Sequence, residues 1–195
     1  MKRTVLNRYA RAVDGRIVID VAAKRVEDLY NNFDKSAPYI RRDLDEDLCD
    51  YLVNCATELK REPFVVRFTL ETPPDDSRQS RIRRSVNAYF LYLAEVERQK
   101  VTQMFRKSAI LFCVGLAILF VSVSVNQALG AERSVVANVF AQGLTVAAWV
   151  SLWESLAIFL IEWFPHRRSI LLYRRLAEAE LIFGPDAGNS VPARE

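Results

Sequence analysis

The hydrophobic and polar positions of the chain fall into three blocks. Residues 1–107 mix apolar and charged positions at short spacings, residues 108–164 contain almost no Lys or Arg, and residues 165–195 are charged again. A mixed pattern is typical of a globular domain, whereas a long apolar block between polar flanks is typical of a membrane anchor. The pattern therefore predicts two kinds of structure in one chain.

The first block predicts the strands of a small sheet. Apolar and polar residues alternate over residues 16–22 and again over residues 64–71, as in strands with one buried face. The pair Asp14-Gly15 favours a tight turn, which would pair residues 8–13 with the first of these strands.

The same block predicts helices. Apolar residues three to four positions apart indicate helices near residues 26–33 and 43–60, and a long helix over residues 78–107. Nothing in the sequence ends this last helix before the apolar block, so it either continues into that block or kinks just below it. Residues 1–76 are thus predicted to form a small α+β domain, and residues 77–107 an amphipathic helix that leads to the membrane.

Two apolar segments are long enough to cross a bilayer, which needs about 20 helical residues. Ser108–Leu129 carries no charge, whereas Val139–Phe164 includes Glu154 and Glu162. A central carboxyl disfavours insertion by about 2.5–3.5 kcal/mol, and each neighbouring large aliphatic residue returns about 0.3–0.6 kcal/mol. We therefore expect the two segments to insert together, as a hairpin of residues 108–164.

The basic residues predict which side of the membrane the chain ends occupy. The loop Asn126–Asn138 contains one cation, Arg133, whereas eight cations flank the other ends of the two apolar segments. Trp163 forms an aromatic anchor beside the basic residues that follow it. The positive-inside rule then places both termini in the cytoplasm. The predicted fold class is an α+β cytoplasmic domain of two or three strands and three helices, fused to an α-helical transmembrane hairpin. The cations that flank the hairpin are Arg98, Lys100, Arg106, Lys107, Arg167, Arg168, Arg174 and Arg175.

Small residues recur every four positions on both apolar segments. Such stripes let helix backbones approach closely in lipid, so they predict the face on which the helices pack, either within one hairpin or between hairpins of an oligomer. The alternative is that small residues are simply common in membrane spans. The two stripes are Ala109, Cys113 and Ala117, and Gly143, Ala147 and Ser151.

Glu154 is the one acidic residue expected deep in the bilayer. Counting from Trp163 at 1.5 Å per residue places it about 14 Å deep, near the midplane. We expect a neutral acid there, hydrogen-bonded to Ser122, to Ser124 or to a second copy of itself. Its role would be either a proton or ion relay or a structural contact between helices.

The last block, residues 165–195, predicts an amphipathic helix with basic and apolar faces. This helix would lie on the anionic inner leaflet or pack on the cytoplasmic domain. Gly188–Glu195 is predicted to be disordered.

Residues suited to catalysis or metal binding are scarce. His166 is the only histidine, and Cys49, Cys55 and Cys113 lack the C-x-x-C spacing of metal or redox sites, so we expect unpaired, buried thiols. Phosphate-binding loops and hydrolase motifs are missing from the sequence. A net charge of +3 does not indicate nucleic acid as a partner. We therefore predict a non-enzyme with no cofactor, metal or small-molecule substrate.

Two charged clusters have two possible interpretations each. The cluster of arginines is either a binding surface for an anionic partner or a solvated helix end. The cluster of acidic residues is either a cation site or the acidic first turns of a helix. The helix interpretation is favoured for both. The clusters are Arg78, Arg81, Arg83 and Arg84, and Asp43, Asp45, Glu46, Asp47 and Asp50.

A pattern of aromatic, aliphatic and basic positions marks the end of the second span. Its residues are Trp153, Leu156, Ile158, Phe159, Leu160, Trp163, Pro165, Arg167, Arg168, Leu172 and Tyr173. In this pattern the chain resembles a family of small, functionally uncharacterised bacterial inner-membrane proteins with two transmembrane helices. The resemblance implies a multi-pass protein of the bacterial inner membrane, and it implies no activity.

Two functions remain open from the sequence. The first is a non-enzymatic, membrane-anchored scaffold or accessory subunit, whose partners would be the lipid bilayer and either a second copy or another membrane protein. The second is an oligomeric pore or ion-conducting effector gated by the cytoplasmic domain. The pore would use Glu154 and the small-residue stripes.

Overall fold

The computed structural model describes residues 6–34, 38–128 and 135–184 of the chain. Two compact units are present: unit 1 comprises Met1–Glu95 with Ile170–Glu195, and unit 2 comprises Val96–Ser169. Arg133 in the predicted loop and the predicted disordered tail Gly188–Glu195 lie outside the described residues.

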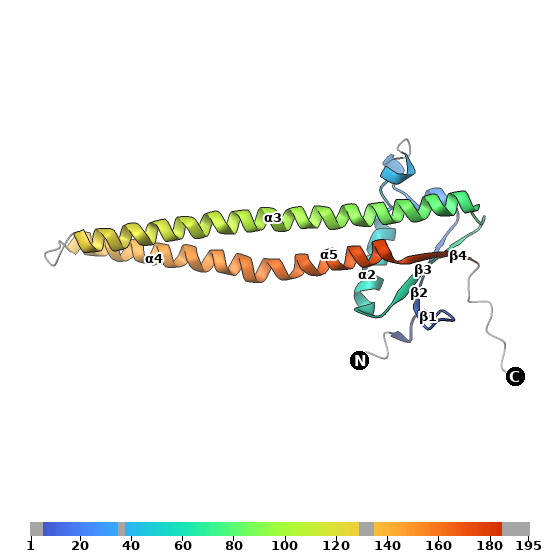
Figure 1. The fold of residues 1–195 in the computed structure, drawn as a ribbon, viewed down its shortest axis with the longest axis horizontal. Coiled ribbons are helices and arrows are strands. Elements are labelled where there is room, and N and C mark those ends of the chain that lie inside the picture. The colour runs from blue at the N-terminus through green and yellow to red at the C-terminus, as the bar shows by residue number, and fades with distance from the viewer. Residues whose placement is uncertain (1–5, 35–37, 129–134, 185–195) are drawn as a thin grey trace. The chain divides into compact units, whose positions relative to one another are not determined.

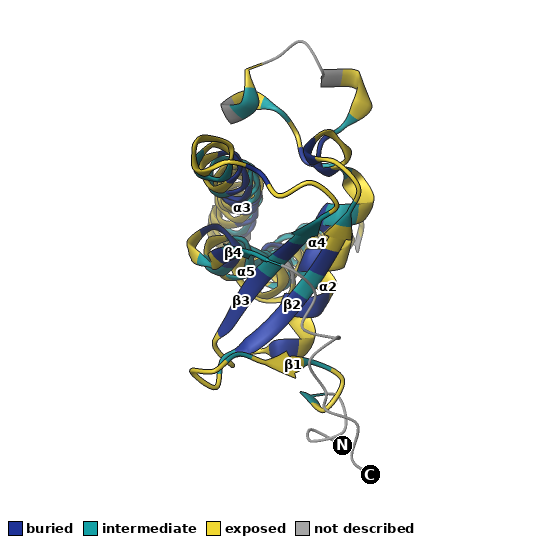
Figure 2. Ribbon diagram, turned by 90° about the vertical axis from the view of Figure 1, so that its right-hand side faces the viewer, coloured by how far each residue is buried: buried dark blue, intermediate teal, exposed yellow. Residues whose placement is uncertain are grey.

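Unit 1 contains a mixed sheet of four strands in the order β1-β2-β3-β4. β1 (Ala10–Arg11) pairs antiparallel with β2 (Ile17–Ala23), while β2 with β3 (Phe64–Leu70) and β3 with β4 (Glu180–Phe183) are parallel. The two central strands carry most of the buried positions (Figure 2). The α+β class predicted from the sequence is therefore correct in outline.

Parallel strands need a crossover connection, and unit 1 has two of them. β2 connects to β3 through α2 (Glu46–Leu59). β3 connects to β4 through α3 (Asp76–Ala128), α4 (Val135–Ala157), the π-helical turn η4 (Ile158–Glu162) and α5 (Trp163–Glu178). The long helices are thus an insertion between two neighbouring strands of one sheet (Figure 1). Of the two alternatives for the helix over residues 78–107, continuation into the apolar block is the one observed.

The end of the chain differs from the prediction. Residues 180–183 were predicted within an amphipathic helix, but they form β4 at the edge of the sheet, with Leu181 beside Val66. Four residues are too few for periodicity to distinguish a strand from a helix end, so pairing with β3 decides the outcome. The residues predicted as a separate C-terminal segment therefore complete the sheet of unit 1.

Helices cover one face of the sheet. Leu176 near the end of α5 is 2% exposed, the ring of Phe90 in α3 stacks on that of Tyr173, and Asn87 donates a 2.8 Å hydrogen bond to the carbonyl of Ala177. Of the two predicted positions for the basic tail helix, its Ile170–Glu178 part takes the one against the domain. The core includes Ile17, Ile19, Leu52, Leu59, Val66, Phe68, Ile82, Val86 and Phe90.

Two local predictions have different outcomes. The turn at Asp14-Gly15 is confirmed: Gly15 has φ +84°, and the amide of Ala12 donates to the carbonyl of Arg16. The helix near residues 26–33 is wrong, because the structure has the 3₁₀ segments Val26–Leu29 and Asn32–Asp34. The few hydrogen bonds of so short a segment do not offset the unfavourable nucleation of an α-helix. A 3₁₀ turn has three residues per turn and therefore places Val26 and Leu29 on the same buried face.

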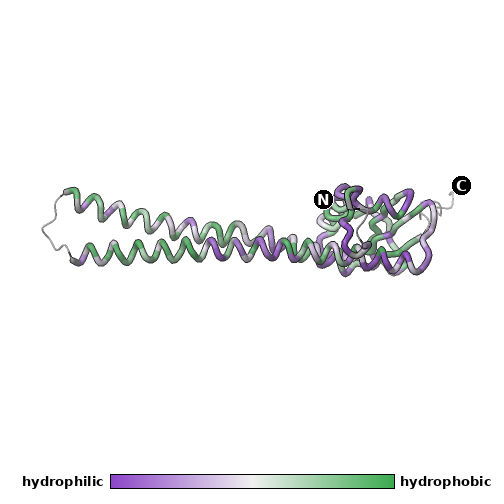
Figure 3. Tube along the Cα trace, turned by 90° about the horizontal axis from the view of Figure 1, so that it is seen from above, coloured by the Kyte–Doolittle hydropathy of each residue, from purple (hydrophilic) through white to green (hydrophobic). Residues whose placement is uncertain are grey.

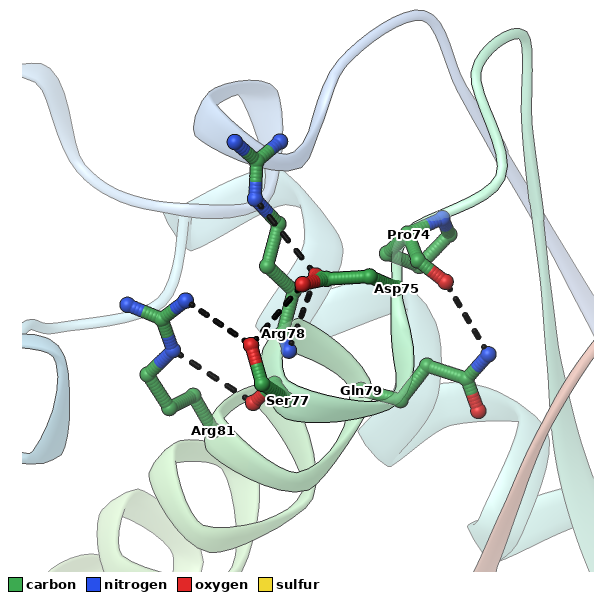
Figure 4. A network of polar contacts seen from close by, with 6 residues as sticks. All are labelled: Pro74, Asp75, Ser77, Arg78, Gln79 and Arg81. Atoms are coloured by element: carbon green, nitrogen blue, oxygen red, sulfur yellow. Dashed lines mark hydrogen bonds and ion pairs between the residues drawn. The ribbon is translucent and has the colours of Figure 1, made fainter.

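The start of α3 separates the predicted arginine cluster into two groups. The carboxylate of Asp75 accepts hydrogen bonds from the Ser77 hydroxyl and the Arg78 amide, and the Arg81 guanidinium donates to the hydroxyl of Ser77 (Figure 4). Arg83 instead donates to the carbonyl of Leu181 in β4. These contacts make the cluster a capped helix start joined to the sheet.

Candidate functional site

Unit 2 is an antiparallel helical hairpin held by small residues that recur every seven positions. Ser108 on α3 contacts Ser155 on α4, and Ser122 on α3 contacts Ala141 on α4. Moving fourteen residues forward along α3 therefore corresponds to moving fourteen residues backward along α4. The helices run side by side in Figure 1. A seven-residue spacing is the period of left-handed helix packing. The buried residues of this interface are Ser108, Gly115, Ser122, Ala141, Ala148 and Ser155.

Hydroxyl groups form the polar contacts between the two helices. The Ser108 hydroxyl donates to the Ser155 carbonyl at 2.8 Å, and the Ser155 hydroxyl donates back to the Ser108 carbonyl at 2.9 Å. Further along, the hydroxyls of Ser122 and Thr145 lie 2.8 Å apart. Interhelical hydrogen bonds of this kind contribute about 0.6 kcal/mol on average in membrane proteins.

Gly115 lies between these two polar layers and fits closely against α4. A Cβ atom at Gly115 would lie 3.2 Å from Leu152 and from the Cβ of Ser151. Gly143, by contrast, has no atom within 4 Å of its Cβ position. The two glycines therefore mark the inner and outer faces of the hairpin.

The outer surface of the hairpin is apolar. Phe120 on α3 is 75% exposed, Phe140 on α4 is 77% exposed and Ile161 in η4 is 72% exposed. Figure 3 shows the hydrophobic colour along most of both helices. Large apolar side chains thus face outward, while hydroxyls and small residues face the partner helix. This distribution is the reverse of that in a soluble protein.

Both helices meet the length and composition needed to cross a membrane. Such segments lie within Asp76–Val125 and Asn138–Glu178. Only 17% and 11% of their most apolar stretches are buried within the structure. The core helix of a soluble protein would be mostly covered, whereas these helices are not.

The small-residue stripes predicted from the sequence lie away from the helix interface. Ala109, Cys113 and Ala117 are exposed on α3, as are Gly143 and Ala147 on α4. Ser151 is half-buried, and its hydroxyl donates to the carbonyl of Ala147 within its own helix. The packed faces of the two helices repeat every 3.5 residues, so residues spaced four apart move progressively away from the contact line. Residues spaced seven apart stay on that line and form the interface.

Glu154 points to the outer surface of the hairpin. It is exposed, and among the described residues its carboxylate has no hydrogen bond or ion pair. The Ser122 hydroxyl, predicted as a partner, contacts Thr145 instead, and Ser124 is exposed. Because Ser155 contacts Ser108, Glu154 is level with the first residue of the predicted first span.

The only histidine of the chain joins the two helices at the polar end of the hairpin. His166 Nδ1 lies 2.7 Å from one oxygen of Glu97, and Lys100 donates to the other at 2.6 Å. Partial burial disfavours ionisation of Glu97, but the hydrogen bonds from Lys100 and His166 hold its pKa below the usual 4.5. Glu97 therefore stays ionised as an acceptor for both groups.

The predicted interface anchors are in contact with one another. The guanidinium of Arg167 lies 5.2 Å from the centre of the Trp163 ring, and that ring stacks on Phe159. Phe159 in turn contacts Phe105 of α3 edge-to-face. Arg168 is exposed. The aromatic residues thus extend the helix interface beyond the seven-residue repeat.

The three thiols are unpaired, and a polar cavity lies in unit 1. Cys49 and Cys55 are buried and unpaired as expected, and burial raises the pKa of the Cys49 thiol; Cys113 is also unpaired but faces outward. In the described part of the chain, no group of three or more metal-binding side chains occurs. A cavity of about 290 Å³ lies where the Tyr9 hydroxyl donates to Glu58.

Comparisons with known proteins add no relative. No family model, no curated protein and no solved structure matches the chain.

Filling the helix interface should destabilise the hairpin. We expect Gly115→Leu to lower the free energy of unfolding by about 1–3 kcal/mol, because the new side chain collides with Leu152 and Ser151. Helix content measured during titration of the full chain from mild detergent into dodecyl sulfate tests this. The matched control is Gly143→Leu, which has open space around it. Equal losses in both variants would contradict the observed interface.

The contacts of Glu97 predict a pH dependence. Because the pKa of Glu97 is lowered in the folded protein, its stabilising contribution is complete above pH 4.5 and is lost as the pH falls through the lowered value. The melting temperature in detergent should therefore be higher for the wild type than for Glu97→Gln at pH 6, and the difference should shrink towards pH 3. Glu178→Gln, at an exposed position of unit 1, is the control. A difference that stays constant with pH contradicts the assignment.

Proposed function

We propose that the chain is an integral membrane protein whose helical hairpin anchors the α+β domain at the cytoplasmic face of a bacterial inner membrane. We further propose that it acts as a non-enzymatic scaffold or accessory subunit. The observation that carries the proposal is the reversed polarity of unit 2, with hydroxyls inside and large apolar side chains outside. Lipid is the surrounding that stabilises this arrangement, because water would disfavour the exposed apolar surface.

The helix register sets the limits of the membrane-spanning part. Ser108–Ala128 on α3 comprises roughly 20 residues, or about 30 Å of helix, which matches the hydrocarbon thickness. Because Ser108 pairs with Ser155, we propose Val135–Ser155 as the matching part of α4, in place of the bounds Val139–Phe164 expected from the sequence. Glu154 then lies at the edge of the hydrocarbon rather than at the midplane, and its carboxylate reaches the polar headgroups.

Connectivity supports the same side of the membrane for both ends of the hairpin. β3 precedes the hairpin, β4 follows it, and the two strands pair in one sheet. A chain that crosses the bilayer between them must therefore return. The contact of Glu97 with His166 also brings the basic flanks of both helices to the same end, and an excess of Lys and Arg favours the cytoplasmic side.

The scaffold proposal is also supported by the packing of unit 1. Its residues pack into a core around the sheet, and the Arg67–Asp20 ion pair links its two central strands. The second candidate, an ion-conducting oligomer, rests on the outward position of Glu154, where subunits of a ring would meet. The two candidates differ in whether Glu154 matters for ion flux.

The membrane proposal predicts a protected thiol at Cys113. In sealed vesicles that contain the full chain with Cys49→Ala and Cys55→Ala, a membrane-impermeant maleimide should not label Cys113 until detergent is added, because the water-soluble reagent does not enter hydrocarbon. The control is Lys107→Cys with Cys113→Ala, which should be labelled only from the cytoplasmic face. Labelling of Cys113 in intact vesicles would contradict the proposed membrane insertion. Labelling of the control from the opposite face would show that the orientation is the reverse of the one proposed.

A flux measurement separates the scaffold from the pore. We expect liposomes containing the purified protein to show no more proton or potassium flux than empty liposomes, and Glu154→Gln to behave as the wild type. A pore would instead give conductance that falls at least tenfold in Glu154→Gln, together with a ring-like oligomer in native mass spectrometry. That result would replace the scaffold proposal.

A further inference from the structure

At the polar end of the hairpin, cations and apolar side chains lie at the same levels along the hairpin axis. We define the collar as residues 97–107 of α3 and 156–168 of the returning chain; it begins after the Ser108–Ser155 contact and ends two residues beyond His166, which contacts Glu97. Its cations are Arg98, Lys100, Arg106, Lys107, Arg167 and Arg168, and all six are exposed.

Apolar side chains of the collar are exposed beside these cations. Leu160 is 59% exposed and Phe164 is 64% exposed, and Leu156 is nearly half exposed. A surface that joins large apolar groups to arginine and lysine is typical of segments at the boundary between headgroups and acyl chains. Hydrocarbon alone would leave the cations unsolvated, and water alone would leave the apolar groups exposed.

Three cations of the collar have no carboxylate partner among the described residues. Glu97 contacts Lys100 and His166. In the described part of unit 2, no carboxylate forms an ion pair with Arg106, Lys107 or Arg168. A negatively charged surrounding would balance these three cations.

We propose that the collar binds anionic phospholipid headgroups, so that the hairpin gathers anionic lipids around it. Arg106 and Lys107 follow directly from the hydrocarbon edge set by Ser108, which is where lipid phosphates lie. At 1.5 Å per residue, the remaining cations lie about 12–20 Å from that edge, so they attract the same charge across roughly one to two Debye lengths and more weakly than Arg106 and Lys107 do. This inference rests on the proposed membrane insertion and adds the class of lipid that is recognised.

The tryptophans of the chain provide the readout. Trp153 is 65% exposed and lies two residues towards the bilayer from Ser155, so acyl-chain bromine quenches its fluorescence when a brominated lipid is adjacent. The full chain with Trp149→Phe and Trp163→Phe leaves this one reporter. It is reconstituted in vesicles of one part phosphatidylglycerol to three parts phosphatidylcholine, with bromine on one lipid or the other.

We expect an anionic preference of fivefold or more in apparent lipid binding, and a decrease of this preference as sodium chloride is raised, since about 1 kcal/mol per cation corresponds to roughly fivefold. Removing four cations from the collar should abolish most of the preference. Removing four exposed cations from unit 1 is the matched control and should not. The first variant carries Gln at Arg106, Lys107, Arg167 and Arg168, and the control carries Gln at Lys24, Arg41, Arg61 and Arg84.

The outcomes distinguish the two proposals. Equal quenching by the two brominated lipids in the wild type overturns the collar proposal and leaves insertion intact. A preference lost equally in both variants also overturns it, because net charge rather than the collar would then be responsible. No quenching by either lipid overturns membrane insertion itself. Because the wild-type comparison and its salt dependence need no cation variant, a variant that fails to fold does not prevent the test.

Discussion

The pairing of β4 with β3 constrains the whole chain. The polypeptide leaves the sheet at Leu70, and the next strand to complete it begins only at Glu180. Closing so long a connection costs only slightly more than closing a short one, because the entropic cost grows with the logarithm of its length. The sheet therefore tolerates a helical hairpin inserted between neighbouring strands. It also requires the inserted segment to return to the sheet.

Inside the inserted hairpin, specificity comes from polar rather than apolar contacts. In lipid, apolar side chains gain little from contacting one another, since acyl chains solvate them equally well. Hydroxyls and small residues then decide which faces meet. The reciprocal hydrogen bonds between Ser108 and Ser155 and the single hydroxyl contact between Ser122 and Thr145 fix the register, and Gly115 lets the helices approach closely between them.

The register in turn determines the electrostatics of the polar end. It aligns Glu97 with His166 and brings the cations of α3 to the levels of the apolar side chains of η4 and α5. It also moves Glu154 from the expected midplane to the level of Ser108. In the proposed membrane placement, a residue expected to be an isolated buried acid therefore lies at the hydrocarbon boundary, and the cations of the collar face the lipid headgroups.

The sequence by itself determined the apolar blocks, the two central strands, the turn at Gly15 and the helical character of residues 78–107, because each depends on a local period or a local backbone preference, whereas the structure decided that this helix continues into the apolar block. Only the tertiary structure decided the strand identity of residues 180–183, the packing faces of the hairpin and the level of Glu154. These depend on which segments meet across long distances in the chain. A four-residue stripe and a seven-residue repeat coexist on the same helices, and only contact with the partner helix selects between them.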